Sequence, residues 1–156
     1  MTEKAFFRKL DAIRKDIKEL RADKWPRKAG VLAINLFNEN FRKGGFLNQT
    51  RVAWKRTKRQ DKPRKTKAGK PSAASTYGPL LSARRHLSRS NEKIVRDGQV
   101  TIVNRVPYAA VHNDGGRAGR QHKTEIPRRQ FIGPSETLDR QIIGMIRTDL
   151  DKLLKQ

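Results

Sequence analysis

Three histidines are the side chains of this sequence best suited to metal or acid–base chemistry. They are His86, His112 and His122, and the last two lie near the carboxylates Asp114 and Glu125. Imidazole and carboxylate groups ligate divalent cations, so such a set would suit a metal-dependent nuclease. The spacing matches no metal-binding motif, and no second carboxylate cluster lies nearby. We therefore predict structural or surface roles for the histidines, with no metal and no other cofactor.

Other catalytic chemistries have little support in the sequence. Cysteine is absent, which excludes disulfides, cysteine-based zinc sites and a cysteine nucleophile. There is no G-x-S-x-G elbow and no glycine-rich loop that would cradle a phosphate. A Ser-His-Asp triad is assembled by the fold and not by spacing, so the sequence leaves that arrangement open. We predict that the protein is not an enzyme.

Charge dominates the composition. The chain has 156 residues with 37 Lys and Arg against 15 Asp and Glu, a formal net charge of +22. A compact monomer of this charge repels itself, and nucleic acid or an acidic protein would relieve the repulsion. No apolar run approaches the roughly 20 residues that span a bilayer, and the N-terminus has no apolar signal-peptide core, so we expect no membrane partner. The length predicts a single domain over residues 1–156.

The positive charge is concentrated in one stretch, residues 51–70, where ten basic residues face a single acid, Asp61. We predict a flexible basic loop over residues 55–78. It is either a solvated insertion or an arm that contacts DNA or an acidic partner protein. The ten basic residues are Arg51, Lys55, Arg56, Lys58, Arg59, Lys62, Arg64, Lys65, Lys67 and Lys70.

Apolar periodicity predicts helices at both ends of the chain. A stripe from Phe6 to Leu20 indicates a first amphipathic helix, which Trp25-Pro26 should interrupt. A second helix should run from Pro26 to about Phe41 and stop at Gly44-Gly45. A final helix should follow Ser135, which suits an N-cap.

Between the helices the pattern changes to strands. Residues 94–96 and 99–103 flank Asp97-Gly98 and predict a hairpin with a type I′ turn. A short helix or turn should cover residues 107–112, and a further strand residues 120–126. Together these elements predict an α+β fold, in which N-terminal helices and a C-terminal helix pack on a small antiparallel sheet.

Four short blocks carry a more specific signal. They are FRKGGF at residues 41–46 with Trp54 behind it, Leu80-Leu81 with LSRS at 87–90, VPYAAVHNDGG at 106–116, and IPRRQFIG at 126–133. In order and spacing they resemble the phage virion morphogenesis family, the Mu-like tail completion proteins. The resemblance covers roughly residues 26–155. Arg85 stands where the family has a glycine, and Arg128 and Gln130 stand where it has a small residue and a second proline.

The resemblance implies a structural virion protein of the neck or tail, assembled in the host cytoplasm. Such a protein completes or terminates the tail, or joins it to the head, as a homo-oligomeric ring around the DNA path. Its expected partners are further copies of itself, other neck or tail proteins, and genomic DNA in the channel. The alternative is a sequence-independent nucleic-acid-binding protein.

The motif residues of the last two blocks include no evident nucleophile, and we expect none of them to act as an acid or a base. We predict that they fix the fold and one subunit interface. They are Tyr108, Ala109, His112, Gly115, Gly116, Ile126, Pro127, Arg129, Phe131 and Gly133.

Overall fold

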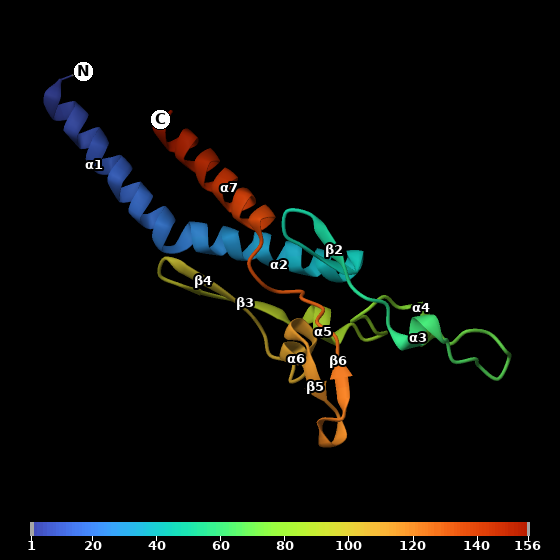
Figure 1. Ribbon diagram of the computed structural model, residues 1–156. Coiled ribbons are helices and arrows are strands. Elements are labelled where there is room, and N and C mark those ends of the chain that lie inside the picture. The colour runs from blue at the N-terminus through green and yellow to red at the C-terminus, as the bar shows by residue number, and fades with distance from the viewer. Residues whose placement is uncertain (1, 156) are drawn as a thin grey trace.

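The computed structural model describes residues 2–155 and combines helices with short antiparallel hairpins, so the predicted α+β class is confirmed (Figure 1). The longer elements are α1 (Glu3–Glu19), the π-helical turn η1 (Leu20–Lys24), α2 (Trp25–Lys43), β3 (Asn91–Arg96), β4 (Gln99–Asn104) and α7 (Glu136–Leu154). The shorter elements are β1 (Gly45–Leu47), β2 (Arg51–Ala53), α3 (Lys58–Asp61), α4 (Ala73–Thr76), α5 (His86–Arg89), α6 (Ala109–Asp114), β5 (Gly116–Ala118), the 3-10 turn η2 (Arg120–His122) and β6 (Thr124–Ile126).

The first two helices form one bent rod, not two separate helices. The chain remains helical through η1, and the predicted interruption at Trp25-Pro26 is wrong in that respect. Pro26 lies in the first turn of α2, where it removes one donor from the helical ladder, and this proline and the π turn before it bend the axis. Gly44 ends α2 as predicted, with φ +65 in the left-handed region.

The strands form three separate two-stranded hairpins, so the single small sheet predicted from the sequence is wrong. β1 pairs with β2, β3 with β4, and β5 with β6, all antiparallel. Strands β1, β2, β5 and β6 have only three residues each, too few to show a period-two pattern.

The β3–β4 hairpin lies where predicted and packs against α2. Gly30 of α2 allows this contact, because a Cβ atom there would lie 2.9 Å from Val100 Cγ2. The predicted type I′ turn is wrong, since Gly98 has φ +66 but Asp97 does not have a positive φ. The Gly98 N–H donates to the Ala22 carbonyl of η1 at 2.8 Å, and this tertiary bond fixes the turn against the bend of the rod.

The C-terminal third differs from expectation in one place. The strand predicted over residues 120–126 is reduced to β6, because Gln121 and His122 have positive φ values of 57 and 51 in the turn η2. The short helix α6 is present and ends at Gly115. The predicted N-cap is confirmed: the Ser135 Oγ accepts the Leu138 N–H at 3.3 Å and donates to the Leu47 carbonyl at 2.8 Å.

The predicted basic loop, residues 55–78, is called the basic segment; it includes α3 and α4, and the chain between those two helices extends away from the body of the molecule (Figure 1). It is not uniformly irregular, because α3, α4 and a single bridge between Lys65 and Pro71 give it local structure. The capping box of Thr57 and Gln60 starts α3. Its flexibility stays a prediction.

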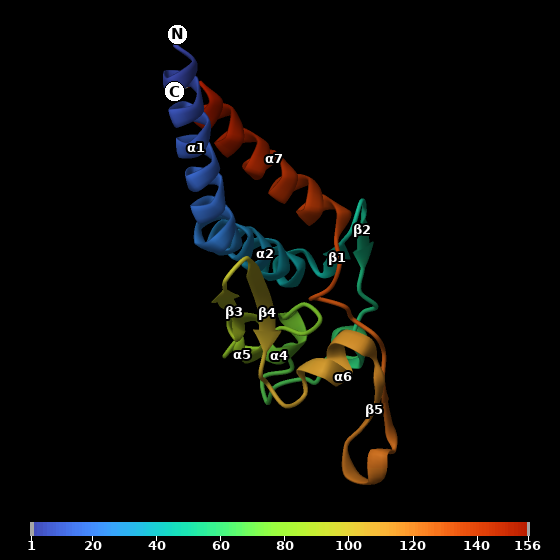
Figure 2. The ribbon, with the colours of Figure 1, turned by 90° about the vertical axis from the view of Figure 1, so that its left-hand side faces the viewer.

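Helix α2 carries both buried clusters of the fold. One joins Ala33, Leu36 and Phe37 to Phe46 and to Leu138 of α7. The other surrounds Phe41 at the C-terminal end of α2. Figure 2 shows α1 and α7 rising from this body as two arms. Within residues 2–155, no helix is at once long and apolar enough to cross a bilayer.

Candidate functional site

The four sequence blocks meet in one buried cluster, which we call the joint. Phe41 lies at its centre, with ring centroids 5.7 Å from Trp54 and 4.9 Å from Phe131. Such tilted and edge-to-face pairs are favourable beyond the area that they bury. Each block contributes at least one side chain, so residues far apart in the sequence close a single core. The members are Phe41, Trp54, Leu87, Val106, Ala109 and Phe131.

A buried amide links the ends of the joint. Asn40 is 0% exposed, and its Nδ2 donates to the Phe131 carbonyl at 3.3 Å. Its Oδ1 accepts the Leu47 N–H at 3.1 Å and Arg51 Nη1 at 3.2 Å. A buried backbone group left without a partner costs about 1–3 kcal/mol, so Asn40 holds the first and last blocks together.

Two more side chains fix the path of the last block. Trp54 Nε1 donates to the Gln130 carbonyl at 2.9 Å. Asn113 Oδ1 accepts the N–H groups of Phe131 at 2.9 Å and Ile132 at 3.0 Å. Sequence reasoning did not single out Asn40 or Asn113. The available signal was an asparagine inside an apolar stripe or beside a motif histidine.

The structure divides the ten predicted motif residues between core, turns and surface. Ala109 and Phe131 are buried in the joint. Gly115 has φ +80 and lies so close to Arg128 that a Cβ atom would meet its backbone nitrogen at 3.0 Å. Tyr108 is exposed, with its hydroxyl 3.1 Å from His86 Nδ1. Four further positions are Gly116 at φ +139, Ile126 in β6, exposed Pro127 and half-buried Gly133.

Arg129 connects the motif residues to the basic segment. Its side chain is buried, and its Nε and Nη2 donate to the Lys55 carbonyl at 3.1 and 3.0 Å. Burial, and then the positive charge of Arg59, lower the pKa of Arg129. The guanidinium of Arg129 therefore holds the start of the basic segment against the joint.

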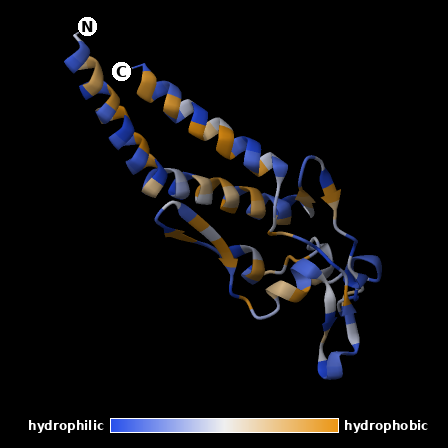
Figure 3. Cartoon of the chain, turned by 60° about the vertical axis from the view of Figure 1, so that its left-hand side comes forward, coloured by the Kyte–Doolittle hydropathy of each residue, from blue (hydrophilic) through white to orange (hydrophobic). Residues whose placement is uncertain are grey.

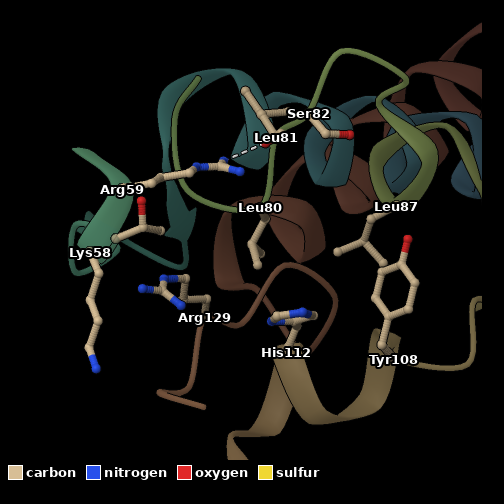
Figure 4. A pocket seen from close by; sticks show the side chains of 10 residues that line it. Lys58, Arg59, Leu80, Leu81, Ser82, Leu87, Tyr108, His112 and Arg129 are labelled. Carbon is tan, nitrogen blue, oxygen red and sulfur yellow. Dashed lines mark hydrogen bonds between the residues drawn. The ribbon is translucent and has the colours of Figure 1, made fainter. Parts of the chain in front are cut away.

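A cavity of about 460 Å³ lies beside this contact (Figure 4). The basic groups of Lys58, Arg59 and Arg129 lie along one side and leucines along another. The Arg59 Nη2 is already bonded to the carbonyls of Gly78 and Leu81. The arginines of this cavity therefore serve as braces for the chain around it.

The three histidines lie on different elements: His86 on α5, His112 on α6 and His122 on η2. Burial, and then the positive charge of Arg129, lower the pKa of His112, which favours the neutral form of its ring. Its Nδ1 is buried without a hydrogen-bond partner. Within residues 2–155, no three His, Asp or Glu side chains gather in a way that would hold a metal ion.

The ten predicted contact residues are not equivalent. Arg51 lies in β2 and is bonded to the Gly45 carbonyl and paired with Glu39 at 3.0 Å. Arg59 braces the cavity, and Arg56 pairs with Asp61 at 2.8 Å. The other seven are exposed and have no ion pair among the described residues: Lys55, Lys58, Lys62, Arg64, Lys65, Lys67 and Lys70.

A comparison with family models assigns this architecture. The model of the phage virion morphogenesis family matches residues 50–151, about two thirds of the chain. The chain therefore belongs to that family, as its four blocks predicted. The matched range contains three of the four blocks. The first block, FRKGGF, lies before that range and contacts the other blocks through Phe41 and the preceding residue Asn40. Searches of curated proteins and of solved structures found no match.

Arg85 stands at the position where the resemblance to the family predicts a glycine. Its φ is +50, in the left-handed region, just before α5. A side chain in that region costs about 1–2 kcal/mol, so Arg85→Gly should raise the free energy of unfolding by about 1 kcal/mol. Urea denaturation measures this. Arg84→Gly, at a neighbouring position without positive φ, should not stabilise. A less stable Arg85→Gly protein would contradict the argument.

Proposed function

We propose that this protein is a structural component of the phage neck or tail, which completes the tail or joins it to the head. The observation that carries the proposal is the joint. Side chains of the four sequence blocks form one buried core, and hydrogen bonds from Asn40, Trp54 and Arg129 fix the chain around it. Family membership gives the role in virion morphogenesis, and the joint supports a protein whose task is to hold a shape.

The proposal includes assembly around the DNA path. Repeated copies of one chain usually close with cyclic symmetry. The seven exposed cations of the basic segment supply charge that a ring would direct at DNA phosphates or at an acidic neighbouring protein. Of these two partners we favour DNA, because five of the cations lie between α3 and α4, in the stretch that extends away from the body (Figure 1): Lys62, Arg64, Lys65, Lys67 and Lys70.

The same exposed cations favour the second candidate function, a sequence-independent nucleic-acid-binding protein that acts outside the particle. The two candidates differ in location. A structural component stays in the purified virion at a fixed copy number, whereas a free DNA-binding protein does not.

The first prediction on function concerns the particle. In the phage that encodes this chain, deletion of its gene should leave heads and tails unjoined or tails with aberrant ends, as seen by negative-stain electron microscopy. Expression of the wild-type chain from a plasmid should restore complete particles that contain it. Complete infectious particles formed without the chain would contradict the proposal.

The second prediction concerns DNA. Each neutralised phosphate contributes about −0.9 to the slope of log K against log salt. Replacing Lys62, Arg64, Lys65, Lys67 and Lys70 with Gln should therefore flatten the slope for duplex binding by up to about 4.5. The matched control removes the same charge from the rod, at Lys4, Arg8, Lys15, Lys18 and Arg21, and should change the slope far less.

Fluorescence anisotropy with two duplexes of unrelated sequence gives both slopes, and the two duplexes should bind alike. An unchanged slope in the first variant would remove DNA as the partner of this segment. An acidic protein surface or a solvated loop would then be the better account.

A further inference from the structure

The cavity beside the joint contains polar groups that the fold leaves unsatisfied. Within residues 2–155, two buried side-chain nitrogens have no hydrogen-bond partner, Arg59 Nε and His112 Nδ1, and both residues line this cavity. Native proteins rarely leave buried polar groups unpaired, because each unpaired group costs free energy. The cavity therefore suits a ligand that forms hydrogen bonds with its lining.

The cavity is also positively charged. Lys58, Arg59 and Arg129 line it, and within residues 2–155 no Asp or Glu does. Arg129 is 6% exposed, and burial, followed by the charge of Arg59, lowers its pKa. Each guanidinium is thus close enough to disfavour the charge of the other, and an anion beside them would relieve this repulsion.

The bracing role of the two arginines leaves them donors for a ligand. Bonds to backbone carbonyls engage one nitrogen of Arg59, Nη2, and two of Arg129, Nε and Nη2. A guanidinium carries five N–H donors, so each side chain keeps N–H groups beyond those that hold the chain.

The motif residues with polar side chains all lie at this cavity. Of the ten motif residues, only Tyr108, His112 and Arg129 have polar side chains, and all three line it. His112 does not belong to the buried core, and its Nδ1 makes no hydrogen bond within residues 2–155. A binding role accounts for a side chain at this position.

The apolar part of the lining narrows the choice of anion. Leu80, Leu81 and Leu87 line another side of the cavity (Figure 4). Hydrophilic residues predominate in the nearby β5–β6 hairpin (Figure 3), so this apolar surface stands out from its surroundings. A sugar–phosphate backbone has no apolar group to cover the leucines, whereas an acidic side chain beside an apolar residue matches both parts of the lining.

We propose that this cavity binds a carboxylate of a partner protein, presented on a segment in which an apolar residue lies beside the acid. Its volume of about 460 Å³ and its apolar lining with a few polar groups are typical of binding pockets. The inference goes beyond the proposed function, because it concerns this cavity and a protein ligand, whereas the DNA contact concerns the basic segment.

Two heptapeptides with blocked ends and an uncharged dye test the site on the full chain. One has a glutamate between two leucines, and the other has glutamine in place of that glutamate. By fluorescence anisotropy, the glutamate peptide should bind at least about tenfold more tightly, because only the carboxylate forms charged hydrogen bonds with the guanidiniums.

A matched pair of variants separates the cavity from the general charge of the protein. Lys58→Gln removes a cation from an exposed position of the cavity lining and should weaken binding of the glutamate peptide about two- to fivefold. Lys62→Gln removes the same charge outside the cavity and should leave binding unchanged. Both positions are exposed, so both variants should fold.

Photo-crosslinking identifies the place of contact. With a diazirine analogue of leucine in the glutamate peptide, cross-links mapped by mass spectrometry should fall on residues 80–82, 87 or 108–112. Equal binding of the two peptides, equal effects of the two variants, or cross-links confined to residues 62–70 would overturn the inference. Loss of the cavity cross-links on addition of a short DNA duplex would assign the cavity to phosphate instead. None of these results bears on the particle experiment, which tests the proposed function separately.

Discussion

The joint around Phe41 is the interaction on which the rest of the structure depends. A chain with 35% hydrophobic residues and a charge of +22 has little apolar surface to bury, so its packing must be concentrated. Phe41, Trp54 and Phe131 bring together segments that no long sheet connects. Asn40 adds polar bonds that are costly to break inside an apolar site.

This constraint explains how a small basic protein presents several projecting parts. The joint and the packing of α2 on α7 hold the body, while α1, the distal half of α7, the basic segment and the β5–β6 hairpin extend from it (Figures 1 and 2). The net positive charges of α1, the basic segment and the β5–β6 hairpin repel one another, and repulsion favours extension over collapse. The proposed assembly and its DNA or acidic-protein partner would add contacts and negative charge to these projecting parts.

The elements that the sequence predicts are those long enough to show a regular apolar pattern. Helices α2 and α7 follow from apolar residues at helical spacing, and β3–β4 from alternation around Asp97-Gly98. Three-residue strands carry no such pattern. The roles of Arg51 and Arg129 were also hidden, because their partners are backbone carbonyls placed by distant segments. Arg51 was grouped with the basic residues of 51–70 because of its charge, although its guanidinium bonds to groups within the body.

Residue-resolved amide hydrogen exchange tests the joint most directly. The amides of Trp54, Ala109 and Phe131 come from three different blocks, and each donates a hydrogen bond inside the body. If one joint holds the blocks, these amides should share a single free energy of opening, close to that of global unfolding, while amides of α1 exchange far faster. Widely different opening energies for the three blocks would show that they fold independently and would contradict the account.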